Sequence, residues 1–277
     1  MIMKINLVRK TRDLVFLLLA LLIGPKLGWA IGRRFIAIAG IGWGSSFDNS
    51  GEKKFIKSAI GKKSNPVIFD VGAHVGEYSS FCRKVNSGCE LHMFEPSDSH
   101  FEVLKSNFSG ELEGSQSAVT KLNDFGLSNI SAKRTLYKNQ DITGIASVHR
   151  RDLSYLDISM DIEEECEFLS PTDYLEQSDV TFINLLKLDI EGEEMNVLRG
   201  FETAFRKKII AVCQFEYGHA NLDSRINFKD FFNYFKDVEY DLYILLPTGR
   251  IDAIKNYSEK YENYYIANFI AMPSEKK

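Results

Sequence analysis

The sequence has little cysteine, and its cysteines lack the patterns on which two common classes of protein depend. The 277 residues include four, Cys82, Cys89, Cys166 and Cys213, with no Cys-x-x-Cys spacing and no clustering with histidines. Disulfide frameworks and cysteine-based metal sites need such patterns. The sequence therefore predicts a reduced, cytoplasmic chain in which the cysteines act as small apolar residues.

The chain also lacks a strong excess of charge. Its 34 basic and 38 acidic residues give a net charge of -4, which argues against a general nucleic-acid binder. Hydrophobic residues make up 44% and charged residues 26%, so a full core can be buried and disorder is not expected. The length fits one or two domains.

Charge is absent altogether from Leu14–Gly24, and Pro25 and Lys26 then interrupt the apolar run. A helix that spans a bilayer needs about 20 apolar residues, so the run is too short unless it continues beyond Lys26. Positive charge lies on both sides of it, which is a membrane-surface signal. We expect a membrane-interface or re-entrant helical arm. The alternatives are a buried packing helix and a signal or anchor span.

The sequence predicts that the chain consists of an amino-terminal arm and one main domain. Residues 1–50 form an apolar and basic arm that ends in a Gly- and Ser-rich linker, and residues 51–277 form the main domain. Residues 1–35 are expected to contact the inner face of a membrane peripherally. Nothing in the sequence indicates the oligomeric state.

After residue 60, short apolar or β-branched runs alternate with amphipathic stretches, which is typical of βα units in a parallel sheet. The last two runs are joined by a loop without a helical pattern, so they are expected to form an antiparallel pair. The fold class is therefore α/β with a seven-stranded, mostly parallel sheet. The expected strands are Val67–Val71, Leu91–Phe94, Thr120–Gly126, Phe182–Leu188, Ile209–Phe215, Leu242–Leu246 and Tyr265–Met272.

Chemistry-bearing residues follow the first expected strand in "FDVGAHVGEYS". Asp70 ends the strand, and Gly72 and Gly76 follow before a helical segment. Glycines in such a turn allow a tight bend and a close approach to a ligand. Ala73 and His74 stand where a dinucleotide fingerprint has its middle glycine, which weakens the case for a bound diphosphate.

An acid follows the next strand, in "LHMFEPS". Glu95 ends this strand and Pro96 stops it, because proline cannot donate to the sheet. A carboxylate about 20 residues after a glycine turn can accept hydrogen bonds from both hydroxyls of a ribose. The two features together indicate an adenosine-containing ligand without a diphosphate.

A third cluster lies in "LLKLDIEGEEMNVLRGF". Asp189 follows a central strand, where open α/β sheets place their ligands. Glu191, Gly192 and Glu194 are expected to open a helix, with acids favoured there by the helix dipole. Gly200 suits the residue after the helix end. A separate helix start is marked by Ser170 as N-cap.

The motifs "FDVGAHVGEYS", "FEPS", "FGLSN" and "LLKLDIEGEEMNVLRG", in this order, resemble the FkbM-type S-adenosylmethionine-dependent methyltransferases from Pro66 to Glu216. The resemblance implies a Rossmann-like class I methyltransferase fold, S-adenosylmethionine as cofactor and transfer of a methyl group to a hydroxyl oxygen. The implied cofactor contacts are Asp70, Gly72, Ala73, His74, Gly76, Glu95, Pro96, Gly126, Leu127, Ser128 and Asp189.

An alcohol acceptor must lose its proton, so a base near the methyl group is expected. Asp189, Glu191 and His219 are the candidate catalytic residues, and Glu216 lies near them in the sequence pattern. These four side chains could ligate a divalent metal, but their spacing matches no ligand signature, so no metal is expected. Residues 143–157 are either a lid or a solvated loop.

The expected function is methylation of a hydroxyl on a sugar, glycan or lipid-linked saccharide. One alternative is an NAD-type oxidoreductase, because different chemistries share this kind of turn. Another is a membrane-tethered binding module without turnover. The acceptor and the methylated position cannot be read from the sequence.

Overall fold

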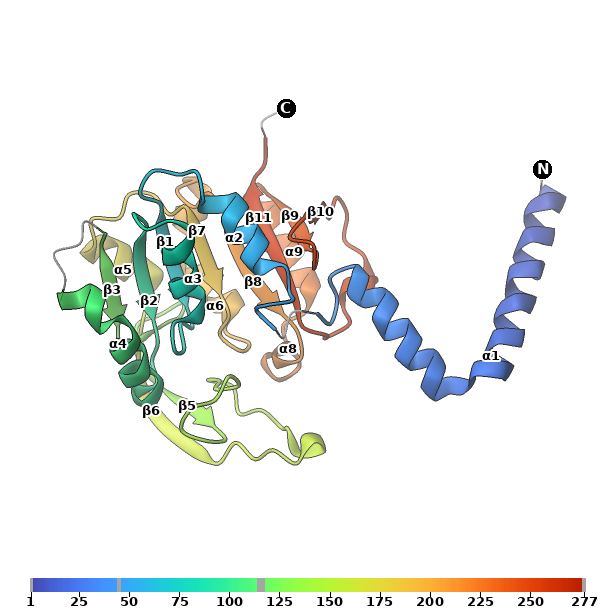
Figure 1. Cartoon of the computed structure of the whole chain (residues 1–277), viewed down its shortest axis with the longest axis horizontal. Coiled ribbons are helices and arrows are strands. Elements are labelled where there is room, and N and C mark those ends of the chain that lie inside the picture. The colour runs from blue at the N-terminus through green and yellow to red at the C-terminus, as the bar shows by residue number, and fades with distance from the viewer. Residues whose placement is uncertain (1, 44–45, 114–117, 276–277) are drawn as a thin grey trace.

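The computed structural model describes residues 2–43, 46–113 and 118–275. It consists of an α/β domain and a long amino-terminal helix that projects away from it (Figure 1). The domain is built on an eight-stranded sheet with the order β10-β9-β11-β8-β7-β1-β2-β3. Its strands are β1 (Val67–Val71), β2 (Glu90–Phe94), β3 (Thr120–Asn123), β7 (Leu185–Leu188), β8 (Cys213–Tyr217), β9 (Tyr240–Leu245), β10 (Ile251–Ala253) and β11 (Ala267–Pro273).

The five strands from β3 to β8 pair in parallel, whereas β11 runs antiparallel to both β8 and β9. The expected mostly parallel sheet with a final antiparallel pair is therefore confirmed, and the fold is the Rossmann-like methyltransferase type. The short strand β10 adds an edge that was not expected. It pairs only with β9 among the strands of the described residues.

Two apolar clusters cover the two faces of the sheet. One packs side chains of α2, α3 and α4 against the sheet, and the other packs those of α5, α6, α7 and α9. Burying both faces is what a parallel sheet requires. The helices of the domain are α2 (Glu52–Ile60), α3 (Glu77–Val85), α4 (Asp98–Glu113), α5 (Pro171–Gln177), α6 (Glu194–Gly200), α7 (Glu202–Arg206), α8 (Ala220–Ser224) and α9 (Phe228–Asp237), with 3₁₀ turns at Ser154–Leu156 and Glu259–Tyr261.

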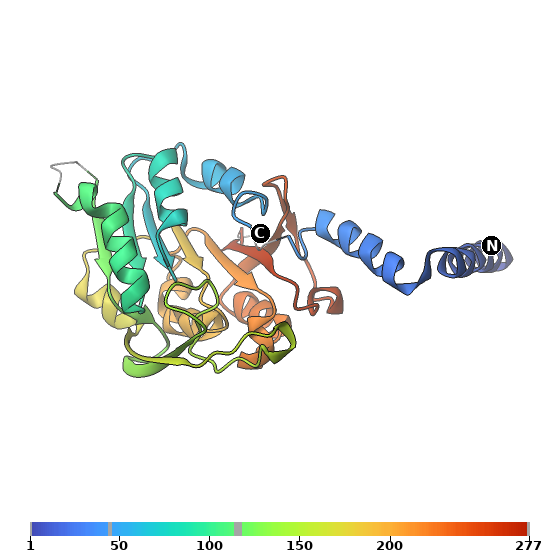
Figure 2. The ribbon, with the colours of Figure 1, turned by 60° about the horizontal axis from the view of Figure 1, so that its bottom comes forward.

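A second, three-stranded sheet was not expected. It consists of β4 (Gly126–Leu127), β5 (Ala132–Lys138) and β6 (Ile162–Leu169), in the order β4-β6-β5. The expected strand Thr120–Gly126 was wrong at its end, because the chain bends after Asn123 and Gly126 joins this other sheet. Figure 2 shows the long connections of this sheet passing beside the carboxyl ends of the parallel strands.

Two details around α6 also differ from expectation. Residues 190–193 form a turn rather than a helix start, since Glu191 and Gly192 have φ values of 51° and 105°. Gly200 does not adopt the left-handed conformation, because α7 follows α6 directly. Glycine fits this position for lack of space instead, since a side chain there would overlap Pro171. The N-cap at Ser170 is as expected, with its hydroxyl accepting a hydrogen bond from the Asp173 N–H at 3.0 Å.

The arm is the helix α1 (Ile2–Ile38), which is broken at Gly24 and turns sharply before Pro25 (Figures 1 and 2). An 18-residue window within Asp13–Ile38 has a mean hydropathy of 2.2, and this part of the helix is long and apolar enough to cross a membrane. No residue of that window is buried against the domain, whereas Ala37 near the end of the helix is buried.

Candidate functional site

The motifs that contain Asp70, Glu95 and Asp189 meet at the carboxyl ends of three neighbouring strands, β1, β2 and β7. The N–H groups of Gly72 and Ala73 each donate to the carbonyl of Phe94 at 3.0 Å, and the Asp189 N–H donates to the carbonyl of Val71 at 3.2 Å. These bonds place the glycine turn between Glu95 and Asp189. Segments more than 90 residues apart in the sequence thus form one site, at the edge where open α/β sheets bind ligands.

The glycine turn needs both of its glycines. Gly72 and Gly76 have φ values of 82° and 86°, which favour glycine. A side chain at Gly72 would overlap the backbone carbonyl of Asp189, and one at Gly76 would overlap Phe108. His74 also has a positive φ of 51°, and its buried Nε2 has no hydrogen-bond partner. The turn therefore presents an unsatisfied imidazole nitrogen at the site.

Glu95 is buried and fixed from both sides. One carboxylate oxygen accepts from the His74 N–H at 2.8 Å, and the other accepts from the Ser97 N–H at 3.0 Å. The Nδ1 atom of His100 lies 3.2 Å from the second oxygen. Each carboxylate oxygen can accept more than one hydrogen bond, so this geometry orients Glu95 and leaves capacity for a ligand.

Two adjoining cavities open at this edge and share Gly72, His74, Gly144, Asp189 and Glu191 as lining residues. The first holds Glu95 and has mainly apolar walls: Val71, Phe94, Leu127, Leu136, Ala146, Val148 and Phe168. The second holds mainly charged or polar groups: Glu52, Asp70, Glu77, Tyr78, Lys187, Asp189, Glu191, Glu216 and His219. The site therefore offers an apolar compartment and an acidic one.

Most of the residues implied by the resemblance line these cavities. Asp70, Gly72, Ala73, His74, Glu95, Pro96, Gly126, Leu127 and Asp189 all do so. Gly76 and Ser128 are not among the lining residues: Gly76 packs against Phe108, and the Ser128 hydroxyl donates to Glu193 at 2.6 Å. The three candidate catalytic residues, Asp189, Glu191 and His219, lie together in the acidic cavity.

Asp70 and Lys187 lie beneath the acidic cavity. Burial raises the pKa of Asp70 to about 6, although Ser79 donates a hydrogen bond to it at 2.6 Å. Burial lowers the pKa of Lys187, but Asp189 and Glu52 raise it by more, so that this lysine stays charged. Its Nζ lies 3.0 Å from Asp189 Oδ2 and 3.7 Å from Glu52 Oε1.

Arg151 joins two of the candidate catalytic residues. Its guanidinium is buried, lies 2.6 Å from Glu191 Oε2 and lies 3.3 Å from His219 Nδ1. Burial raises the pKa of Glu191 to about 8 in spite of Arg151. Burial and Arg151 both lower the pKa of His219. Residues 143–157 thus supply a buried structural residue to the site rather than only a solvated loop.

The same segment covers the cavities. Gly144 lines both of them, and the preceding Thr143 N–H donates to His100 Nε2 at 3.0 Å. The Ser147 hydroxyl donates to the Glu191 carbonyl at 2.7 Å. These bonds attach the segment to the turn at Glu191 and to the helix that follows Glu95.

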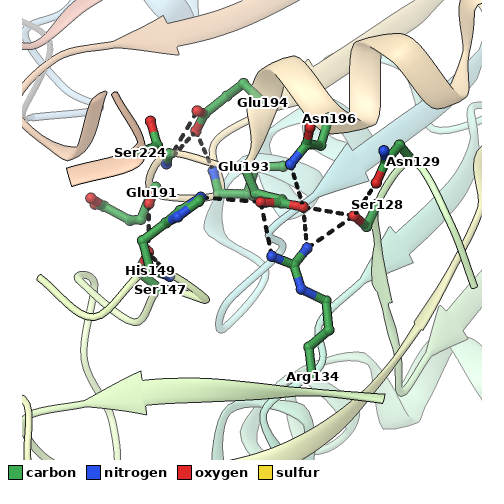
Figure 3. A network of polar contacts seen from close by, with 12 residues as sticks. Ser128, Asn129, Arg134, Ser147, His149, Glu191, Glu193, Glu194, Asn196 and Ser224 are labelled. Atoms are coloured by element: carbon green, nitrogen blue, oxygen red, sulfur yellow. Dashed lines mark hydrogen bonds and ion pairs between the residues drawn. The ribbon is translucent and has the colours of Figure 1, made fainter. Parts of the chain in front are cut away.

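Glu193 is the centre of a polar network (Figure 3). The sequence pattern did not distinguish Glu193 from its acidic neighbours. Glu193 accepts hydrogen bonds from Ser128, which directly follows β4, and from Arg134 in β5, and it lies 3.1 Å from His149 Nε2. Burial raises its pKa, but the bonds from His149, Arg134 and Ser128 lower it further, to about 2. Glu193 therefore ties the second sheet to the turn that carries Glu191.

Glu194 has a different environment from Glu193. Its carboxylate accepts from the N–H groups of Ile190 and Gly192 at 3.1 Å each and so closes the turn before α6. Burial raises its pKa to about 7. The helix dipole favours an acid in the first turn of a helix, but it does not explain the specific contacts of Glu193 or those of Glu194.

The sequence analysis also did not identify Leu136 and Phe168 as walls of the apolar cavity. The alternation of residues in their strands could have indicated that they face inward. In β6 the exposed Glu163, Glu165 and Glu167 alternate with inward-facing residues, and Phe168 continues the inward set. This two-residue period is typical of a half-buried strand.

Three carboxylates approach each other closely enough to suggest a metal site. Oxygen atoms of Asp189, Glu191 and Glu216 lie within 4.8 Å of one another. However, Lys187 already neutralises Asp189 and Arg151 already neutralises Glu191. A metal would have to compete with these two ion pairs for its ligands, so the donor set fits a divalent metal poorly.

Comparisons with known proteins give the family. Residues 70–242 match the methyltransferase FkbM domain. The 31-O-demethyl-FK506 methyltransferase FkbM of Streptomyces tacrolimicus is 22% identical over 171 residues, which cover 55% of this chain and 66% of that protein. The match thus spans slightly less than two thirds of the curated relative.

Solved structures resemble the chain more weakly. The methyltransferase FkbM of Methylobacillus flagellatus has a TM-score of 0.48 at 15% identity, covering 75% of this chain and 43% of that one. The O-methyltransferase of Bacillus cereus in complex with SAH has a TM-score of 0.44 at 12% identity, covering 94% and 97%. The family match itself extends over more than half of the sequence. The chain belongs to the FkbM methyltransferase domain family.

Proposed function

We propose that this protein is an S-adenosylmethionine-dependent methyltransferase that methylates a hydroxyl of a sugar, glycan or lipid-linked saccharide. One observation carries the proposal: an apolar cavity holding Glu95 and an acidic cavity holding Asp189, Glu191 and His219 share a wall at the glycine turn. A donor in the first can thus meet an acceptor in the second. Membership of the family favours methyl transfer over the oxidoreductase alternative.

The residues of the apolar cavity fit the cofactor. Glu95 would accept hydrogen bonds from the ribose hydroxyls, as carboxylates do at this position. Leu127 and Phe168 would pack against adenine. The unpartnered Nε2 of His74 would gain a ligand partner. Leaving a buried polar atom unpaired costs about 1–3 kcal/mol, so a ligand contact there is favoured.

When bound, S-adenosylmethionine supplies an electrophilic methyl group and a neutral leaving group. The chain must hold the acceptor oxygen in line with that group, and such positioning can contribute about 7–11 kcal/mol. We assign the orientation to Glu95 and the shared glycine turn. The turn abuts the Asp189 carbonyl, so the cofactor and the proposed base are held by adjoining backbone.

Asp189 is the proposed general base. Lys187 holds its Oδ2 atom, and the carboxylate lines both cavities. His219 is less suited to this role in the arrangement seen. Its Nδ1 accepts from Arg151, so a neutral ring carries its proton on Nε2 and can only donate there. Glu191 is also less suited, because its carboxylate is held by the buried Arg151 at 2.6 Å.

The acidic cavity favours a neutral acceptor. Its carboxylates would repel an anionic group near the reacting oxygen, whereas they can accept hydrogen bonds from several hydroxyls of a sugar. The name of the curated relative refers to an O-demethylated substrate. This supports an oxygen acceptor here without identifying it.

We further propose that the protein acts in the cytoplasm, with the arm in contact with the inner face of a membrane. The exposed apolar segment Asp13–Ile38, with basic residues on both sides, supports this. A bilayer would cover side chains that the domain leaves exposed. The acceptor would then be a membrane-borne molecule.

Calorimetry with S-adenosylhomocysteine tests the cofactor assignment. We expect binding to the full chain and a loss of about 10-fold or more for Glu95→Ala, because two ribose hydrogen bonds to a charged group are removed. Absence of binding to the unmodified protein would refute the assignment. Transfer of a labelled methyl group to fractionated glycans and lipids tests the reaction, with Asp189→Asn expected to lower the rate by about 10²–10⁴-fold.

A further inference from the structure

A cleft distinct from the two cavities described above lies where the arm joins the domain. Residues of α1 form one side, and Trp43 and Tyr265 form the other. Arg33 and Arg34 both line it. In Figures 1 and 2 this junction lies at the end of the second helical segment of α1, beside the carboxyl-terminal strands.

The two arginines carry uncompensated positive charge. The Arg33 guanidinium lies 5.4 Å from the centre of the Tyr265 ring, and the Trp29 ring is 6.4 Å from the same ring. Among the ion pairs formed by the part of the chain that the structure describes, none involves Arg33 or Arg34. A pair of guanidinium groups without carboxylate partners is suited to a phosphate, which accepts their planar donors.

The position of the cleft relates it to a membrane surface. Its residues from α1 belong to the last part of the apolar segment Asp13–Ile38. Its aromatic residues Trp43 and Tyr265, and Trp29 beside Tyr265, are of the kind that gather at the level of lipid headgroups. Arginines at that level meet lipid phosphates. The proposed membrane contact would therefore bring a phosphate to this cleft.

The cleft also adjoins the acidic cavity. The Gly42 N–H donates to the Ile266 carbonyl at 2.9 Å, and Ile266 lines the acidic cavity while its neighbour Tyr265 lines the cleft. Basic and acidic sites thus meet at two successive residues. A ligand that reaches across them would place its anionic part at the arginines and a neutral part beside Asp189.

We propose that Arg33 and Arg34 bind the phosphate of a membrane lipid whose polar part carries the acceptor hydroxyl. This inference rests on the proposed function, because it identifies the acceptor of that reaction as a phosphate-bearing lipid. The distribution of charge supports this proposal. The carboxylates of the acidic cavity would repel the phosphate from the reacting centre, whereas the arginines of the cleft would attract it. The phosphate acts as the anchor for the neutral portion.

Vesicle binding by the full chain tests the site. The probes are phosphatidylcholine vesicles that contain a long-chain alkyl phosphate, and phosphatidylcholine vesicles brought to equal surface charge with a long-chain alkyl carboxylate. Binding is followed by the fluorescence of Trp29 and Trp43, the two tryptophans of the chain, and by flotation. The variant is Arg33→Ala with Arg34→Ala. The matched control, Arg9→Ala with Lys10→Ala, removes the same charge before the apolar run.

Each lost basic residue near an anionic surface weakens binding by about fivefold, so both double variants are expected to lose about 25-fold from surface charge alone. The proposal predicts a further loss of about 10-fold for Arg33→Ala with Arg34→Ala, confined to the alkyl phosphate vesicles. Equal losses for the two double variants, or equal losses on both kinds of vesicle, would overturn it.

Two more measurements separate this site from the reaction. Binding of S-adenosylhomocysteine should be unchanged in Arg33→Ala with Arg34→Ala, since neither residue lines the apolar cavity. Failure of the unmodified chain to bind S-adenosylhomocysteine, with phosphate-selective vesicle binding intact, would overturn the proposed function and leave a phosphate site. Inorganic phosphate that binds the cleft as tightly as the alkyl phosphate would overturn the lipid part of the inference.

Discussion

Lys187 and Asp189 form an ion pair although they stand two positions apart at the end of one strand, with Nζ 3.0 Å from Oδ2. The lysine side chain is 4% exposed and the aspartate 40%, so the pair reaches from the core to the cavity wall. Glu52 lies on the other side of the lysine. The proposed base is thus held by a charge buried beneath it.

We expect Lys187→Met to destabilise the protein by about 3 kcal/mol, because it removes the charge beside the buried Glu52 carboxylate. The free energy of unfolding in urea measures this. Lys207→Met, on an exposed position, should change it by less than about 0.5 kcal/mol. Similar values for the two variants would show that the buried pair does not stabilise the fold.

Glu193→Gln should lower stability at neutral pH and alter its pH dependence. The folded-state pKa of Glu193 is about 2, below its usual value of 4.5. The charged form therefore stabilises the fold above pH 4.5, and this contribution of about 3 kcal/mol is lost as the pH falls towards 2. Urea unfolding between pH 2 and 7 measures the slope, and an unchanged slope in the variant would contradict the assignment.

Glu194→Gln should have the opposite pH dependence. Burial raises the pKa of Glu194 from 4.5 to about 7, so the protonated form is the favoured one in the folded protein. Its contribution is present below pH 4.5 and is lost as the pH rises through 7. The variant should therefore lose less stability than the parent between pH 5 and 8. A larger loss in the variant would argue that Glu194 is charged in the fold.

Gly72→Ala should destabilise the protein by about 2 kcal/mol or more and weaken binding of S-adenosylhomocysteine. The backbone there has φ +82°, and the added methyl group would overlap the Asp189 carbonyl. Gly110→Ala is the control, since it lies in α4 with open space around it and should raise stability by up to about 1 kcal/mol. Thermal unfolding with and without S-adenosylhomocysteine measures both effects.

Leu17→Asp with Leu21→Asp should release the protein from membranes. Both side chains are exposed in the apolar segment, at 58% and 75%, and an aspartate within a membrane costs about 2.5–3.5 kcal/mol. Recovery in the membrane fraction is the measurement. Ile130→Asp, on an exposed loop of the domain, is the control. Equal recovery of both variants would contradict membrane contact through the arm.

The sequence predicts this fold well where local pattern and pairing agree. The strands around Asp70, Glu95 and Asp189 are apolar runs that end in a polar residue, and parallel pairing brings such ends together. Glu193 could not be predicted in this way. Its partners Arg134 and His149 approach it only after the second sheet has folded over the site, and one helix-dipole argument covered all neighbouring acids equally.

The place of β11 in the sheet has a consequence for how the protein is made. It lies between β8 and β9 and is hydrogen-bonded to both, so these two strands have no direct pairing with each other. On the ribosome, β1, β2 and β7 can associate early, whereas β8 and β9 cannot join one sheet until residues 267–273 emerge. During that interval the edge of β8 is unpaired, so the growing chain is exposed to wrong strand pairing until its last strand is made.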